Sequence, residues 1–395
     1  MPSSSKAAII AAARTAIGTA RKGTLANTEP IELAKPIVAA AVERSGLAPT
    51  DFDDLVLAES LQGGGDSARY IAVDLGFETI PGAAVNRQCA SSLAAIAFGA
   101  GQIASGMSSA ILAGGMESLS TMPQFLKRKP FTTGKEADDY TRWAPMSNPI
   151  DTPDAPPFDM SITVAHNCAV EYGLTREDQD AWALRSHQRA VKAVDAGSFV
   201  DEIVPIQVKQ ADGSFITFAE DEHPRRSTSM ETLAGLKVLH PEIEGFSVTA
   251  GNSSGTNDAA AVVALAAPDT DQEVLAHILS WSQVGVPPKR TGSGPIYAIP
   301  KALELAGRKL SDVALFEINE AFAAQAVACT RQLGLDEDIV NVYGSGISLG
   351  HPIAATGARM VTSSIYELRR RGGGIGVISM CAGGGMGAAM VIEVT

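Results

Sequence analysis

Two stretches of the chain, AVERSGLAPTDFDDLVLAES (residues 41–60) and ALELAGRKLSDVALFEINEA (residues 302–321), can be laid side by side. Ala, Glu, Gly and Asp recur in them at the same offsets. Each stretch has the pattern of a helix that stops at a glycine, Gly46 or Gly307, before a short turn and a buried strand. The chain therefore contains a similar α/β unit twice.

A second pair of segments supports this repeat. CASSLAAIAFGAGQIASG begins at Cys89, HPIAATGARMVTSSIYELRRRG begins at His351, and both have the pattern of a helix. Each is followed by an apolar strand that closes with glycines, SSAILAGGMES in one half and GIGVISMCAGGGMG in the other. Repeated units of this kind predict an α/β fold built from two duplicated halves, with helices packed on parallel or mixed sheets.

The repeat is absent between about Ser120 and Gly245, where Pro, charged and turn residues are frequent. One helix is predicted there, beginning at a capping box of Thr175 and Asp178 and stopping at Gly197. We expect this segment to cover the functional site, as loops on a rigid scaffold often do. The predicted organisation is a first half (residues 1–119), a loop domain (120–245), a return to the first half (246–270) and a second half (271–395).

Composition excludes several classes of protein. With 395 residues the chain can bury a large core, and a net charge of −13 disfavours general nucleic-acid binding. No uninterrupted apolar run approaches the roughly 20 residues that cross a bilayer, so no membrane association is expected. The cysteines are far apart and have no metal-ligand spacing, which predicts neither a metal site nor a disulfide framework and favours a cytoplasmic location. These four are Cys89, Cys168, Cys329 and Cys381.

Cys89 and His351 occupy equivalent places, each at the start of a predicted helix. At a helix N-terminus the macrodipole favours an anion, so we expect the pKa of the Cys89 thiol to be lowered. Pro352 suits the first turn of a helix and holds His351 at its mouth. A thiol and an imidazole that face each other activate sulfur as a nucleophile. The alternative for Cys89 is a small core residue, which is the commoner fate of a buried thiol.

Two further segments carry candidate groups. Cys381 ends a strand in MCAGGGMG, whose glycines expose consecutive amides that can bind a developing negative charge, although they also suit a tight turn. Asn319 and Glu320 follow the repeated strand in EINEAFAAQ, at the end of the strand where α/β sheets bind ligands. All these groups are expected to meet between the two halves.

Six segments together resemble the thiolase family: NRQCASSLAAI, AGGMES, TAGNSSGTNDAAA, NEAFAAQ, LGHPIAATGAR and CAGGGMG. They occur in this order over most of the chain. The resemblance implies a five-layered α/β/α/β/α fold and a homodimer or homotetramer. It also implies coenzyme A and acyl-CoA as substrates, with no tightly bound cofactor.

The resemblance implies a role for each candidate. Cys89 would carry the acyl group, His351 would take its proton, and Cys381 would be a second acid and base. The amides of Cys89 and Gly383 would bind one oxyanion, and His351 with a water held by Asn319 would bind the other. The residues implied to contact coenzyme A or the acyl group are Met160, Arg225, Ala250 and Ser254.

Three positions depart from the family pattern. Ser92 replaces a usual Gly, which could narrow the space beside the thioester. Asp159 stands where short-chain members often have His, and His166 replaces a usual Glu. These departures bear on acyl-chain preference and leave the predicted chemistry in place.

The sequence thus predicts an acyl-CoA C-acyltransferase that cleaves a 3-ketoacyl-CoA with coenzyme A or condenses two acetyl-CoA molecules. Two alternatives are a decarboxylating ketoacyl synthase, which uses one Cys with two His, and a carrier of thiolase shape without catalysis. Acetoacetyl-CoA or another 3-ketoacyl-CoA is the expected substrate, and the physiological direction is open.

Overall fold

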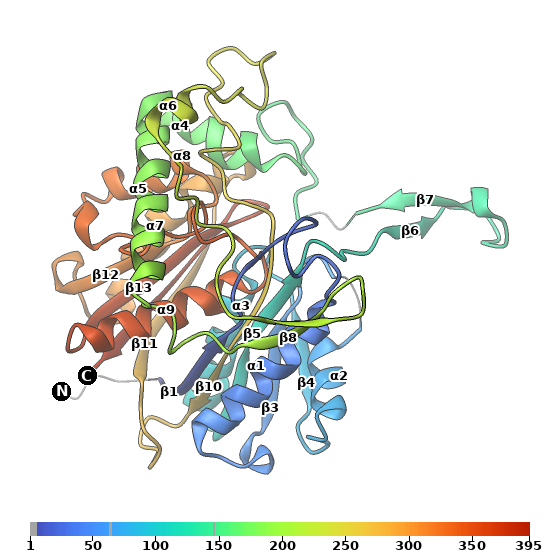
Figure 1. Cartoon of the computed structure of the whole chain (residues 1–395), viewed down its shortest axis with the longest axis vertical. Coiled ribbons are helices and arrows are strands. Elements are labelled where there is room, and N and C mark those ends of the chain that lie inside the picture. The colour runs from blue at the N-terminus through green and yellow to red at the C-terminus, as the bar shows by residue number, and fades with distance from the viewer. Residues whose placement is uncertain (1–5, 63–64, 145–146) are drawn as a thin grey trace.

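A computed structural model describes residues 6–62, 65–144 and 147–395 (Figure 1). The first half of the chain alternates strands with helices, as the repeat predicted. Its strands and helices are β1 (Ala7–Arg14), β2 (Gly18–Thr19), α1 (Pro30–Ser45), β3 (Asp54–Ala58), α2 (Ser67–Asp74), β4 (Gly82–Val85), α3 (Ser91–Ala104) and β5 (Ala110–Ser118).

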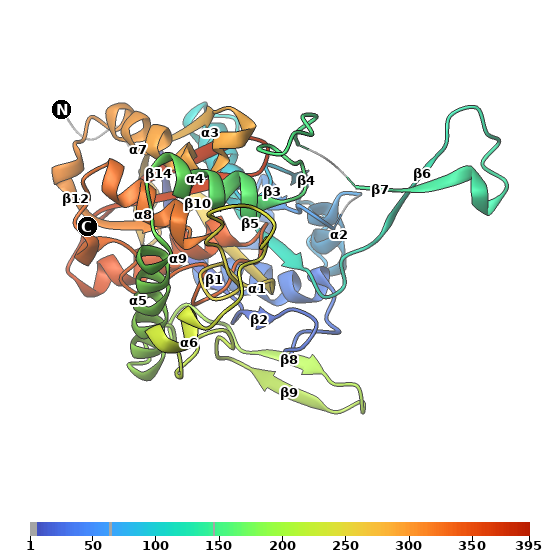
Figure 2. The same cartoon turned by 90° about the horizontal axis from the view of Figure 1, so that it is seen from above.

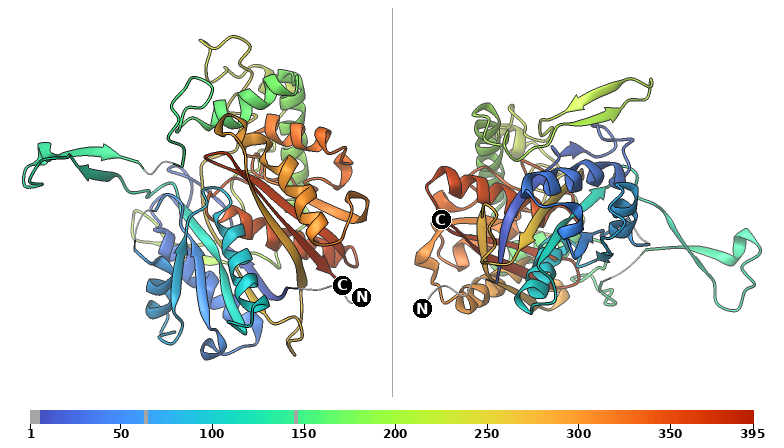
Figure 3. Two further views of the ribbon diagram at one scale, coloured as in Figure 1. Left: turned by 180° about the vertical axis from the view of Figure 1, so that it is seen from behind. Right: turned by 90° about the horizontal axis from the view of Figure 1, so that it is seen from below.

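The middle of the chain is mostly hairpins and short helices. Its elements are β6 (Phe125–Arg128), β7 (Tyr140–Trp143), a π-helix (Ser161–His166), α4 (Asn167–Glu171), α5 (Arg176–Asp195), β8 (Ile206–Lys209), β9 (Phe215–Phe218) and α6 (Met230–Ala234). The predicted capping box is confirmed, since Thr175 Oγ1 accepts from Asp178 N at 3.1 Å and Asp178 Oδ2 accepts from Thr175 N at 2.9 Å. The β6–β7 and β8–β9 hairpins leave the body at separate places (Figures 2 and 3).

The rest of the chain completes the first half and forms the second. Its strands and helices are β10 (Asn257–Ala266), β11 (Ala276–Gly285), α7 (Gly294–Leu305), β12 (Val313–Ile318), α8 (Ala323–Gln332), α9 (Thr356–Arg370), β13 (Gly374–Ala382) and β14 (Met386–Val394). Short 3₁₀ turns precede β3 and β12 at corresponding places of the repeat. The predicted helix stops hold at Gly46 and Gly307, which have φ of 72° and 65°.

The strand order confirms the duplication and the mixed sheets. In the first half β3 runs parallel to β5, β5 antiparallel to β10, and β10 antiparallel to β1. The second half repeats this pattern in β12, β13, β14 and β11. The two half-sheets are continuous, because β1 also pairs with β11 from Ala7↔Ile278 to Ile9↔Ala276.

Helices divide the structure into layers. Helix α1 packs on β10, β1 and β5, while α7 packs on β14, β11 and β13. Helices α3 and α9 pack against each other, and each contacts strands of both halves. The helices that begin next to Cys89 and His351 therefore lie between the two half-sheets, which stand side by side in Figure 1. This arrangement confirms the α/β/α/β/α class and sets both residues at the boundary between the halves.

The described residues contain neither a membrane-spanning helix nor a group of side chains suited to a metal ion. Among them, no helix is both long and apolar enough to cross a bilayer. In the same parts of the chain, no three or more His, Cys, Asp or Glu side chains are grouped so that they could hold a metal ion.

Candidate active site

Cys89 lies in a tight turn between β4 and α3. Gln88, just before it, has a left-handed backbone with φ of 51°. Ser91 supports this turn, because its hydroxyl accepts from Arg87 N at 2.7 Å and donates to the carbonyl of Gln88 at 2.6 Å. The first helical residue of α3 is Ser91, so Cys89 stands just ahead of the helix, as predicted.

The protonation state of Cys89 differs from the expectation. Burial raises the pKa of the thiol to about 11, although hydrogen bonds from the backbone amides of Gly383 and Cys89 itself act in the opposite direction. The predicted lowering was wrong, because desolvation of the sulfur outweighs the favourable dipoles of the amides and the helix start. At neutral pH Cys89 is therefore a thiol, which must give up its proton to a base as it attacks.

His351 is held from three sides. Its backbone N–H donates to Asn257 Oδ1 at 2.9 Å, Nδ1 lies 2.7 Å from Thr356 Oγ1, and Nε2 lies 3.3 Å from Asn319 Nδ2. The Thr356 hydroxyl donates to the carbonyl of Pro352 at 2.8 Å. This network assigns the ring proton to Nδ1 and leaves Nε2 as the acceptor that a base needs.

The charge of His351 follows from its surroundings. Burial, together with the positive charge of Arg359, lowers the pKa of the imidazole to about 3. The ring is thus neutral at physiological pH and can accept a proton. In the free protein both groups are therefore uncharged, Cys89 as a thiol and His351 as a neutral imidazole.

Cys381 and Asn319 lie on neighbouring strands of the second half. Asn319 follows the end of β12, and its backbone N–H donates to the carbonyl of Ser379 on β13 at 2.9 Å. Burial and electrostatic interaction with Cys89 raise the pKa of Cys381 well above the ordinary value of a thiol. Gly383, two residues later, donates its amide to the Cys89 thiol. Of the five predicted residues, the structure places Asn319 beside His351, and Gly383 and Cys381 beside Cys89.

Glu117 is a further residue of this site that the sequence reasoning did not assign. It is fully buried near the end of β5, where it accepts from Gln62 Nε2 at 2.8 Å and from Ala354 N at 3.1 Å. Burial raises the pKa of this carboxyl group to about 7, and its charge raises the pKa of Cys89. A lone carboxylate in the otherwise apolar, fully buried strand AILAGGMES was the signal in the sequence.

Met160 and Ser254, two of the residues expected to contact substrate, lie close to this centre. Met160 packs beside Cys381 and Ala321, and its sulfur lies 3.7 Å from where a Cβ on Gly383 would stand. Ser254 donates its amide to the carbonyl of Ala321 at 2.9 Å. Met160 therefore lies beside Cys381, and Ser254 is hydrogen-bonded to Ala321 of the same cluster.

Arg225 and Ala250 are exposed, and among the described residues neither contacts the reactive groups. The backbone of Arg225 donates to His187 Nδ1 at 3.2 Å. Two residues earlier, His223 lies so close to Gly255 that a Cβ there would come within 2.3 Å of the ring. The segment that carries Arg225 therefore abuts the one that carries Ser254.

Asp159 and His166, two of the departures, have partners of their own. Asp159 Oδ1 accepts from the Ser161 hydroxyl at 2.6 Å, and Oδ2 lies 2.8 Å from His240 Nε2. His166 stacks on Phe246 with ring centroids 4.9 Å apart. Asp159 thus links the start of the π-helix to the loop that carries His240, and His166 packs against Phe246.

These contacts describe one reactive centre. A nucleophilic thiol under two backbone amides, a neutral imidazole and a second thiol on an α/β scaffold define an enzyme of the cysteine-dependent acyl-transfer class. Residues 7–269 match the model of the thiolase N-terminal domain, and residues 272–394 match that of the thiolase C-terminal domain. The chain belongs to the thiolase family and is an acyltransferase.

Relatives agree over nearly the full length. A 3-ketoacyl-CoA thiolase of Bacillus subtilis is 40% identical, with 98% of this chain and 99% of the relative covered. An acetyl-CoA acetyltransferase of Escherichia coli is 39% identical, with 98% of each chain covered. The crystal structure of the Bacillus anthracis acetyl-CoA acetyltransferase has a TM-score of 0.91 at 42% identity, with 99% of each chain covered.

Proposed function

We propose that this thiolase works through an acyl group carried on Cys89. The observation that supports this most is the pairing of two thiols, with Cys89 under the amide of Gly383 and Cys381 in electrostatic contact with it. One thiol can form the thioester while the other moves protons at carbon or sulfur, and one group cannot do both. The reaction is thiolysis of a 3-ketoacyl-CoA or its reverse, the condensation of two acetyl-CoA molecules.

In the first step of condensation, Cys89 attacks the thioester carbonyl of acetyl-CoA. His351, neutral at physiological pH, takes the thiol proton and gives it to the sulfur of the departing coenzyme A. The negative charge on the carbonyl oxygen is stabilised by the amides of Cys89 and Gly383. The products are acetyl-Cys89 and free coenzyme A.

In the second step, Cys381 first loses its own proton to solvent and then, as a thiolate, takes a proton from the methyl group of another acetyl-CoA. The resulting carbanion attacks acetyl-Cys89, the bond between the acyl carbon and the Cys89 sulfur breaks, and the Cys89 thiolate takes the proton that Cys381 carries. A water held by Asn319, whose side chain lies 3.3 Å from that of His351, would stabilise the enolate oxygen by donating a hydrogen bond to it. Thiolysis runs through the same steps in reverse, with Cys381 taking the proton of coenzyme A.

We propose that coenzyme A is a substrate, which binds and dissociates in each catalytic cycle, and not a tightly bound cofactor. Ser254 and Ala250 would contact its pantetheine arm, and residues 120–245 would cover it. Arg225 is exposed and forms no salt bridge with the described residues, so its guanidinium is available to the nucleotide phosphates. The four cysteines are free thiols, which supports a reducing compartment, and we propose the cytoplasm.

Neither alternative fits the site as well. A decarboxylating ketoacyl synthase pairs one Cys with two His, whereas the second partner here is Cys381. A carrier without catalysis has no need for a thiol, an imidazole and an amide side chain brought together in one buried centre.

The experiment that tests this function is the coenzyme-A-dependent cleavage of 3-ketoacyl-CoAs of different length. We expect kcat/KM for acetoacetyl-CoA to exceed that for 3-ketodecanoyl-CoA by about tenfold or more, because Met160 packs against Cys381 and limits the room for a chain. Met160→Ala should narrow this ratio. Equal rates would show a pocket open to long chains, and no cleavage of either substrate would favour the carrier.

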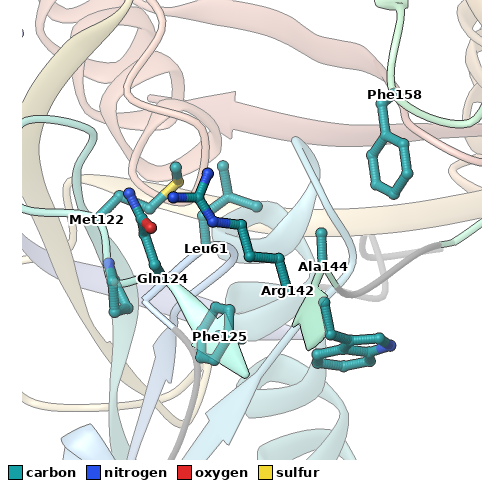
Figure 4. A pocket seen from close by; sticks show the side chains of 9 residues that line it. Leu61, Met122, Gln124, Phe125, Arg142, Ala144 and Phe158 are labelled. Carbon is teal, nitrogen blue, oxygen red and sulfur yellow. The ribbon is translucent and has the colours of Figure 1, made fainter. Parts of the chain in front are cut away.

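We further propose that the protein is a homodimer or homotetramer, with the β6–β7 hairpin as a docking arm. The hairpin projects from the body (Figures 1 and 2), and large apolar side chains on it are exposed. They include Leu126, Phe131, Tyr140 and Trp143. At its base lies a hollow of about 540 Å³ between Leu61, Met122, Phe125, Arg142 and Phe158 (Figure 4). Apolar surface of this extent is typical of a protein–protein contact.

Light scattering of the purified protein tests the proposed arm. The wild type should have the mass of two or four chains, and replacing Leu126 and Phe131 by Ser should lower that mass if the arm joins dimers. Tyr70→Ser, which removes an exposed aromatic side chain on α2, is the matched control. A wild-type mass of one chain, or an unchanged mass in the double variant, would contradict the proposed arm.

A further inference from the structure

Ser92 makes a hydrogen bond between the two helices that begin beside the reactive groups. It is the second residue of α3, and its fully buried hydroxyl accepts from Ala358 N at 3.0 Å. Ala358 is the third residue of α9, where a helix leaves its backbone N–H without a carbonyl partner. Ser92 therefore accepts a hydrogen bond from the first turn of α9, as an N-cap side chain does, although it belongs to another helix, α3.

The two helices touch at this point. A Cβ on Gly357 would lie 2.6 Å from the backbone nitrogen of Leu93, so only glycine allows this approach. The residues in contact, Ser92 and Leu93 against Gly357 and Ala358, all lie in the first turns of α3 and α9. The hydrogen bond of Ser92 thus fixes the register of one N-terminus against the other.

Each N-terminus is linked to one of the reactive groups. Cys89 precedes α3 by two residues, and Thr356, the first residue of α9, holds His351 Nδ1 at 2.7 Å. A shift of α9 against α3 would therefore move the imidazole relative to the thiol. The expectation that Ser92 narrows the space at the thioester was wrong, because its hydroxyl is directed at α9.

Two other side chains hold the segment between His351 and α9. Asn257 Oδ1 accepts the amide of His351, and Glu117 accepts the amide of Ala354. Both contacts lie in the turn that precedes α9. Of these three side chains, only Ser92 belongs to α3, the helix next to Cys89. It bonds to α9, whose first residue, Thr356, contacts the imidazole.

We propose that Ser92 is a positioning residue, which sets the His351 imidazole against the Cys89 thiol by capping α9 from α3. The inference rests on the roles proposed above for Cys89 and His351. It concerns the geometry of proton transfer and not the binding of substrate, because Ser92 is buried away from solvent. Its loss should therefore lower kcat and leave KM nearly unchanged.

The test compares Ser92→Ala and Ser92→Gly with the wild type. We expect kcat for acetoacetyl-CoA thiolysis, and the rate of Cys89 alkylation by iodoacetamide at neutral pH, to fall by about tenfold, with KM within about twofold. Ser364→Ala is the matched control, because that hydroxyl is buried on α9 and has no hydrogen-bond partner among the described residues. It should change neither rate.

The alkylation rate of Cys89 in a His351→Ala background distinguishes a positioning role of Ser92 from a general loss of packing. His351→Ala alone should slow alkylation of Cys89, and adding Ser92→Ala should slow it no further, because the base that Ser92 positions is gone. Additive losses, or unchanged alkylation in both Ser92 variants, would overturn the role of Ser92. If His351→Ala itself left alkylation unchanged, the proposed thiol–imidazole pair would be wrong instead.

Discussion

Cys89→Ser is expected to lower the rate of thiolysis by about 10⁴-fold or more and to leave binding of coenzyme A largely intact. Both the nucleophile and its proton contribute to this loss. A hydroxyl group holds its proton far more tightly than a thiol, so the neutral imidazole of His351 removes that proton much less readily. The oxyanion amides and the coenzyme A contacts remain in this variant.

Steady-state kinetics with acetoacetyl-CoA and calorimetric titration with coenzyme A measure the two effects separately. Cys168→Ala is the matched control, because it removes a buried thiol that the mechanism does not use. It should keep most of the activity of the wild type. Turnover by Cys89→Ser near the wild-type rate would refute the nucleophile assignment.

Cys381→Ala is expected to separate the two halves of the reaction. Acetyl-CoA should still acylate Cys89, because that step uses His351 and the amides of Cys89 and Gly383. Condensation should fall by about 10³-fold, since no group remains to take the proton from the methyl carbon. The variant should release about one equivalent of coenzyme A per site in a burst and then stop.

The charges in the site give this order of events a physical basis. The negative charge of an ionised Cys89 raises the pKa of Cys381. Acetyl-Cys89 cannot ionise, so this contribution to the pKa of Cys381 is absent once the thioester has formed. Normal condensation by Cys381→Ala, or the absence of a burst, would contradict the division of labour between the two thiols.

Much of the fold was predictable because the sequence repeats itself. The pattern of a helix, a glycine stop and a buried strand predicted an α/β unit. Because this pattern occurs in both halves, it also predicted the duplication that the strand order shows. Pairing of β1 with β11, which makes the two half-sheets continuous, was not predicted. Such pairing depends on how two strands meet in space, and no local pattern records it.

The site was predicted less evenly. The predicted helix start holds beside Cys89, but α9 begins at Thr356, five residues after His351, so Pro352 lies in the turn before the helix. The sign of the Cys89 pKa shift was wrong because desolvation depends on the whole surrounding core. The contacts of Glu117 and Ser92 were not predicted, since their partners, Ala354 and Ala358, lie more than 200 residues away in the sequence. Local sequence patterns do not predict such contacts between the halves.

The most direct test of the account is to incubate the protein with acetyl-CoA, quench it in acid and map the acetyl group by peptide mass spectrometry. We predict that one acetyl group is found on the peptide that contains Cys89, and that no acetyl group is found there in His351→Ala at short reaction times. An acetyl group on Cys381, or no acetylated peptide at all, would contradict the acyl-Cys89 intermediate on which the mechanism depends.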